Sequence, residues 1–254
     1  MFRRFRILFF HELRMQFVTP ATYVAGTLFL AGMGVVHWLA LWDATRNEQS
    51  WLPSENFFRV YWLPAILFVP LLTMRSFAEE RRQGTLGAML TTPVGPLTVT
   101  LAKFASAYVL YVGLWAITMA YPFIAKGALV AASADDRLVS VPSLIGGMLF
   151  IAASSTLYIA AGLLCSALTR SVMVAGIMAM LVVCVLIAGH HLLYLAGDSY
   201  DNLAWLKNPA QLLNTTKYAE DFVRGIVDTR PFLHFGSFAM LAVGATSYVI
   251  ESKA

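Results

Sequence analysis

Four consecutive charged residues, Glu79, Glu80, Arg81 and Arg82, are the side chains best suited to specific contacts with a partner. Carboxylate and guanidinium groups attract surfaces of opposite charge and fix the register between two proteins. Each would cost roughly 2.5–3.5 kcal/mol at the centre of a lipid bilayer, so all four must lie in water or against another protein. The pattern indicates recognition, and we expect no catalytic residue and no metal site in this chain.

The residues around these charges predict a structured element rather than a plain connector. Ser76 followed by Glu79 matches a capping box, which predicts that a short helix begins near Phe77. Gly84 is a natural stop for this helix, and Thr85 is placed to cap a second short helix. We therefore expect a cytoplasmic helix–Gly–helix segment that connects two membrane spans.

The composition indicates that the elements around this segment lie in a membrane. Hydrophobic residues make up 59% of the 254 residues and charged residues 13%, whereas soluble proteins have about 45–50% and about 25%. The mean hydropathy is +0.68. The net charge of +4 fits the gathering of basic residues on the cytoplasmic side of membrane proteins, so we expect a lipid bilayer and no nucleic acid as partner.

Six apolar stretches are each long enough to cross a bilayer, which takes about 20 helical residues. They cover residues 21–42, 57–74, 97–124, 144–168, 172–196 and 231–250. Pro64 and Pro70 fall inside the second stretch, where they predict a kink. Three residues separate the fourth stretch from the fifth, which predicts a tight helical hairpin. We expect an all-α membrane protein with six transmembrane helices.

An amphipathic helix is predicted over residues 2–17, before the first span. One face is apolar and the other basic, and the side chains that define them are Phe2, Phe5 and Phe9, and Arg3, Arg4 and Arg14. A basic, phenylalanine-rich helix of this kind lies in the membrane interface. Pro20 separates it from the first span, so we expect an interfacial helix rather than the beginning of that span.

The distribution of basic residues predicts the orientation in the membrane. With the N-terminus inside, the cytoplasmic side holds ten of the 18 Lys and Arg residues against four acidic residues. The opposite side holds eight basic residues against ten acidic ones. Since basic residues favour the cytoplasm, we expect both termini there. Residues 197–230 are then an extracytoplasmic loop, whose apolar side chains favour a small re-entrant or amphipathic cap.

Two stretches of the sequence resemble a known family. Residues 75–86, Arg-Ser-Phe-Ala-Glu-Glu-Arg-Arg-Gln-Gly-Thr-Leu, closing with Leu-Thr-Thr-Pro at 90–93, resemble the segment after the second span of ABC type-2 permeases, most closely the gliding-motility-type branch. Residues 222–230, Phe-Val-Arg-Gly-Ile-Val-Asp-Thr-Arg, also look like that family. The helix at 2–17 matches its elbow helix, and the topology matches as well. Gly87 departs from the pattern, since many relatives carry an acidic residue there.

This resemblance implies that residues 1–254 form one permease domain of an ABC exporter in the bacterial inner membrane. Residues 75–96 would couple the domain to a separate ATPase subunit. The coupling residues would be Ser76, Phe77, Glu79, Glu80, Arg81, Arg82, Gly84 and Thr85. A second permease, identical or different, and a membrane-anchored periplasmic protein are the other implied partners.

The sequence offers no ATP site of its own. A P-loop requires a Gly-Lys pair, and none occurs in these 254 residues. We therefore expect this chain to bind no cofactor, with ATP and Mg on the partner ATPase.

Two other classes of membrane protein stay open. Histidines on facing helices ligate heme iron, and a heme or quinone protein is one alternative because four histidines fall near the outer ends of spans: His37, His190, His191 and His234. A secondary transporter carries ionisable residues near the middle of its spans. Lys103 is the one clear candidate for that role, although we expect it to extend to the inner membrane surface.

Overall fold

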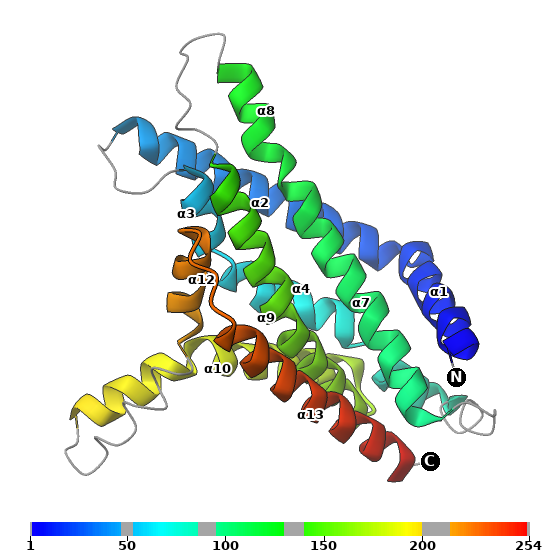
Figure 1. The fold of residues 1–254 in the computed structure, drawn as a ribbon. Coiled ribbons are helices and arrows are strands. Elements are labelled where there is room, and N and C mark those ends of the chain that lie inside the picture. The colour runs from blue at the N-terminus through cyan, green and yellow to red at the C-terminus, as the bar shows by residue number, and fades with distance from the viewer. Residues whose placement is uncertain (1, 47–52, 86–94, 130–139, 200–213, 253–254) are drawn as a thin grey trace.

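The computed structural model describes residues 2–46, 53–85, 95–129, 140–199 and 214–252 (Figure 1). All elements in these ranges are α-helices: α1 (Phe2–Val18), α2 (Pro20–Arg46), α3 (Pro53–Arg59), α4 (Trp62–Thr73), α5 (Ala78–Gln83), α7 (Pro96–Thr118), α8 (Ala120–Leu129), α9 (Val141–Leu168), α10 (Val172–Ser199), α12 (Thr215–Val223) and α13 (Arg230–Ser252). The prediction of an all-α chain is confirmed for this part. The predicted second short helix of the 75–96 segment falls mostly on residues outside it.

Five helical segments are long and apolar enough to cross a membrane. They are Pro20–Asp43, Pro96–Gly127, Val141–Leu168, Val172–Ala196 and Arg230–Ser252. These segments match five of the six predicted spans. The predicted second span differs, because two shorter helices, α3 and α4, take its place.

The division between α3 and α4 follows from Pro64. In an α-helix residue 64 would donate its N–H to the carbonyl of Val60, but proline has no N–H. The Val60 carbonyl accepts the N–H of Leu63 instead, at 3.1 Å, while Tyr61 keeps right-handed helical angles (φ −52°, ψ −29°). Regular α-helical bonding is therefore lost over a short stretch in which the backbone remains helical.

Helix α9 is the central helix of the bundle (Figure 1). Within the membrane-length window of α9, 72% of the residues are buried, against 22–33% for the other four segments. Close neighbours require glycine on its surface. A Cβ atom added at Gly147 would lie 2.5 Å from the ring of Phe58, and one at Gly162 would collide with the hydroxyl of Thr73.

The α3–α4 pair runs parallel to α9 and remains in register with it. Phe58 packs on Gly147 near the beginning of α9, and the backbone of Phe77 bonds to Ser166 near its end. The two residues of each pair are 89 positions apart in the sequence. Despite its prolines, the second apolar segment therefore follows α9 over most of its length.

The two ends of the described chain lie at the same end of the bundle (Figure 1). Glu12 of α1 binds Lys103, close to the beginning of α7. Val243, in the second half of α13, belongs to an apolar cluster with Leu101 and Phe104 of α7. Because α1 and α13 meet the same part of α7, both terminal helices reach one side of the molecule.

Candidate functional site

The beginning of α5 is capped by a side chain from another helix. The Ser166 hydroxyl of α9 accepts the N–H groups of Phe77 and Ala78, each at 3.1 Å, and donates to the Met74 carbonyl at 3.0 Å. The first N–H groups of a helix have no partner within the helix, so this buried serine supplies one. It also attaches α5 firmly to α9.

The predicted capping box between Ser76 and Glu79 is not formed. Helix α5 begins at Ala78, so Phe77 is the N-cap residue, and no side chain of α5 caps it. The Ser166 hydroxyl of α9 already accepts the first N–H groups at the beginning of α5, so a capping box between Ser76 and Glu79 is not needed. The predicted stop is confirmed, because Gly84 has left-handed backbone angles (φ 71°) at the end of α5, a conformation that glycine adopts at no steric cost.

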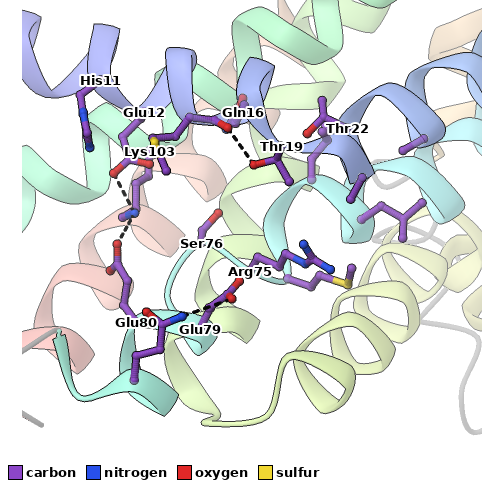
Figure 2. A pocket seen from close by; sticks show the side chains of 17 residues that line it. His11, Glu12, Gln16, Thr19, Thr22, Arg75, Ser76, Glu79, Glu80 and Lys103 are labelled. Atoms are coloured by element: carbon purple, nitrogen blue, oxygen red, sulfur yellow. Dashed lines mark hydrogen bonds and ion pairs between the residues drawn. The ribbon is translucent and has the colours of Figure 1, made fainter.

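Lys103 of α7 is held between carboxylates of two other helices (Figure 2). Its Nζ donates to Glu80 Oε1 of α5 at 2.7 Å and to Glu12 Oε1 of α1 at 2.9 Å, and its side chain is 4% exposed. The ammonium also lies 5.4 Å from the ring centroid of Phe77, an attractive cation–π geometry. The expectation that Lys103 extends to the membrane surface is wrong, because its charge is neutralised inside the protein.

The cluster of Lys103, Glu80 and Glu12, called here the ionic cluster, has one more carboxylate than ammonium. Within the described residues, Glu80 Oε2 is buried without a hydrogen-bond partner. Burial raises the pKa of the Glu80 carboxyl above its ordinary value, the positive charge of Lys103 partly offsets this, and the negative charge of Glu12 raises it further. The ionised form of Glu80 is therefore under electrostatic strain that a proton relieves.

We expect the Glu80→Gln variant to weaken the dependence of stability on pH. Because the pKa of Glu80 is higher in the folded than in the unfolded chain, folded protein retains a proton that unfolded protein has already released. As pH rises above the ordinary glutamate pKa of about 4.3, this group therefore lowers the free energy of unfolding of the wild type. Thermal unfolding in detergent between about pH 4 and 7 measures the slope.

The matched control for that experiment is Glu79→Gln, one residue away on the outer side of α5. Its side chain is 35% exposed, against 25% for Glu80. Within the described residues it forms an ion pair with Arg82 and none with Lys103. It should retain the wild-type slope. Equal slopes in the wild type and Glu80→Gln would contradict the assignment.

The four consecutive charges of α5 point in two directions. Arg81 Nη1 donates to the Ala167 carbonyl at the end of α9, at 2.6 Å, and Glu80 belongs to the ionic cluster. Glu79 and Arg82, 35% and 64% exposed, form a loose pair at 4.0 Å and make no bond to another helix within the described residues. The inner pair therefore attaches α5 to the bundle, and the outer pair presents charge to whatever lies beside it.

The predicted elbow residues lie on α1 as two distinct faces. Phe2 begins the helix, and Phe5 and Phe9 are half-buried with ring centroids 6.2 Å apart. The basic face, formed by Arg3, Arg4 and Arg14, is exposed. Gln16 Nε2 donates to the Ser106 hydroxyl of α7 at 3.3 Å, so α1 is attached to α7 at a second point besides Glu12.

A cleft of about 500 Å³ lies beside the ionic cluster, between α1, α2, α4, α5 and α7 (Figure 2). Polar side chains, including Glu12 and Gln16, line it from α1, and Glu79 lines it from α5. Leu71 and Leu72 line it from α4. The cleft separates α1 from α4, and beside it the ionic cluster joins α1 to α5 through Lys103.

Sequence reasoning did not assign three residues to this site, Lys103, Glu12 and Ser166, although it singled out Lys103 as an isolated charge. Lys103 is the one charged residue in the apolar stretch 97–124, and Glu12 is the one acidic residue in the amphipathic stretch 2–17. An isolated charge in such a segment requires a partner of opposite sign, and these two could have been paired on that ground. Ser166 has no comparable signal.

At the other end of the bundle, the 197–230 segment contains α12, which packs on α9 and α3. Tyr61 donates to the Thr215 hydroxyl at 3.0 Å, and Arg59 pairs with Glu220 at 3.4 Å. A Cβ atom added at Gly146 would collide with the backbone of Phe222. The described part of this segment therefore forms a docked amphipathic helix.

The four histidines considered for heme lie at three separate places. His37 packs against Phe57 and Tyr121, and His190 and His191 are neighbours on α10 that hydrogen-bond each other at 3.1 Å. His234 lies beside aromatic rings of its own helix. Among the residues that the structure describes, no three His, Cys, Asp or Glu side chains are arranged to hold a metal ion.

Comparison with known proteins identifies the family. A family model described as "ABC-2 family transporter protein" matches residues 45–213, which is more than half of the chain and includes α3 to α10. No curated protein matches the sequence. Membrane domains of this family are transporter components that usually work with an ATPase subunit. The chain belongs to the ABC-2 family and is a multi-pass membrane permease of an ABC transporter.

Proposed function

We propose that the chain is the permease half of an ABC exporter of the gliding-motility-type branch in a bacterial inner membrane. In this proposal α5 transmits the movement of a separate ATPase subunit. The observation that carries it is the attachment of α5 to three helices at once: to α9 through Ser166 and Arg81, and to α7 and α1 through the ionic cluster. A loop that only connected two spans would not require these bonds.

The proposed topology has six crossings, with α3 and α4 together as the second. Residues 53–73 extend about 30 Å at 1.5 Å per residue, which equals the hydrocarbon thickness of a bilayer. Terminal helices at one side of the bundle require an even number of crossings, and the five long helices alone give an odd number. The basic residues at this side, among them Arg75, Arg81 and Arg170, favour the cytoplasm.

The proposed mechanism is a rigid lever. Closure of the ATPase subunits displaces α5, and the hydrogen bonds at Ser166 and Arg81 carry this displacement to α9. Lys103 carries it to α7 and, through Glu12, to α1. Helix α1 lies in the interface, where its basic face follows the lipid headgroups as the spans move.

The proposed assembly contains two permeases and two ATPase subunits, because one permease with six spans would be half of a transporter. The second permease is a copy of this chain or a related chain, and a membrane-anchored periplasmic protein is a further partner. ATP and Mg bind to the ATPase, and this chain holds no cofactor and carries out no covalent chemistry.

Exchanging the two outward charges of α5 is expected to weaken association with the ATPase. The double variant Glu79→Arg/Arg82→Glu retains an ion pair across one helical turn but reverses the charge presented at each position. Mismatched charges at an interface cost several kcal/mol, so we expect the ATPase recovered with the tagged chain to fall at least about tenfold. The measurement is a mild-detergent pulldown from native membranes with mass spectrometry of the bound proteins.

The matched control exchanges the exposed pair at the other end of the bundle, Asp228→Arg/Arg230→Asp. That pair is separated by 3.8 Å and Arg230 is 80% exposed, so the two variants make the same kind of change. The control should recover as much ATPase as the wild type. Recovery of an ATP-binding-cassette subunit with undiminished yield from both variants would exclude the outer face of α5 from the interface, and recovery of none from the wild type would oppose the proposed function.

A further inference from the structure

A second groove, of about 590 Å³, lies between α5 and the turn that joins α9 to α10. It is lined by Met74, Arg82, Arg170, Ser171, Val172 and Met173. The function proposed for α5 uses its outer charges and its bonds to α9, but assigns nothing to this groove. It combines two guanidinium groups with an apolar wall, so a ligand that fits it has both a negative charge and an apolar part.

The groove has more positive charge than its surroundings compensate. Arg81 does not line the groove but interacts with Arg170, since burial and then the charge of Arg170 lower the pKa of the Arg81 guanidinium below its ordinary value. Within the described residues no carboxylate pairs with Arg170, and Glu79 pairs with Arg82 at the long distance of 4.0 Å. Two arginines therefore line the groove and a third interacts with Arg170, against one distant carboxylate, which favours an anionic ligand.

The apolar wall of the groove continues into an exposed apolar face of α10. Met173 is 75% exposed, and Ile177 and Leu181, which follow at intervals of four residues, are 54% and 60% exposed. Residues four apart lie above one another on a helix, and this helix is the most apolar of the five membrane-length segments. A molecule in the groove would therefore contact guanidinium groups at one end and an exposed apolar helix surface at the other.

We propose that this groove binds an anionic phospholipid, with its phosphate on Arg170 and Arg82 and an acyl chain along the Met173 face of α10. Guanidinium groups bind phosphate through paired hydrogen bonds, and basic residues at the membrane surface favour anionic headgroups. An acidic segment of another protein would satisfy the charges but not the exposed apolar surface of a membrane-length helix. The phospholipid accounts for both features.

The bound lipid would also stabilise the attachment of α5 to α9. Its phosphate would compensate the repulsion between Arg81 and Arg170 while Arg81 remains bonded to Ala167. This inference depends on the membrane location of the chain and not on the ATPase partner, so the two proposals fail separately.

The test is lipid retention by the full-length chain purified in mild detergent. Phosphatidylglycerol and phosphatidylcholine of equal chain length are offered in equal amounts, and native mass spectrometry measures the ratio that remains bound. We expect the wild type to prefer phosphatidylglycerol, and Arg170→Gln to reduce that preference about fivefold, the change expected for one basic residue near an anionic bilayer surface. Arg170→Lys, which retains the charge, should preserve most of the preference.

Two controls decide between the possible sources of the effect. Arg230→Gln removes another exposed arginine at the other end of the bundle and should leave the lipid ratio unchanged. Inorganic phosphate added in excess should not displace the lipid, because it lacks the acyl chain. The proposal is overturned if Arg170→Gln retains the wild-type ratio, if free phosphate displaces the lipid, or if the variant loses the ATPase in a pulldown while its lipid ratio is unchanged.

Discussion

Replacing Lys103 by methionine is expected to lower the free energy of unfolding by about 3 kcal/mol, since removal of one partner from a buried ion pair strands the remaining charge. Methionine has a similar volume, so the loss comes from charge rather than packing. Glu12 and Glu80, 20% and 25% exposed, would then face each other without a cation. Unfolding of the purified chain in detergent measures the change.

A compensated variant separates charge from other effects of this substitution. Lys103→Met combined with Glu12→Gln and Glu80→Gln removes the cation and both carboxylates together. Replacing a whole buried ionic group by neutral side chains is often close to neutral in stability, so the triple variant should recover most of the loss. If Lys103→Met unfolds like the wild type, or if the triple variant is no better than the single one, the ionic cluster does not hold these helices together.

The second large effect is expected at the other end of the bundle, near the beginning of α9. Gly146→Ala places a methyl group against the carbonyl of Phe222, and this neighbour is backbone, which cannot rotate away as a side chain would. Helix α12 must therefore shift from its seat, and overpacking of this kind costs about 1–3 kcal/mol. The free energy of unfolding should fall by that amount, and hydrogen exchange should accelerate in the α12 amides.

Gly244→Ala on α13 is the matched control for this substitution. It also adds one methyl group within a membrane-length helix, but a Cβ atom at Gly244 meets nothing within 4 Å. Alanine is favoured over glycine in helices by up to about 1 kcal/mol, so this variant should be as stable as the wild type or slightly more stable. Equal losses at both positions would mean that Gly146 is required for some reason other than the approach of α12.

The elements of this fold that were predicted correctly are those that depend on local pattern. Five spans follow from the length of apolar runs, α1 from its two-faced periodicity, and the end of α5 from Gly84. The divided second span was predicted in part, because Pro64 and Pro70 indicated a kink but not the loss of a continuous helix. No local pattern reveals that α3 and α4 run in register with α9.

The parts of the candidate site that could not be predicted depend on contacts between distant residues. The pattern of Ser76 and Glu79 is a legitimate capping box, yet Ser166 supplies the cap from 89 positions away. The spacing of three residues places Glu79 and Arg82 on one side of a helix, but the sequence does not state which side meets the bundle. Only the packed structure distinguishes the two charges that are used internally from the two that face outward.

Because α9 is one continuous buried helix, it can transmit movement from one membrane surface to the other. Gly146, where α12 rests, and Ser166, which caps α5, belong to the same uninterrupted helix and are separated by about 30 Å at 1.5 Å per residue. When a continuous helix shifts along its axis as a rigid body, its two ends move together and by the same amount. Communication between the two membrane surfaces would then require no relay of side-chain rearrangements, and a single proline placed midway along α9 would interrupt it while leaving both end contacts chemically intact.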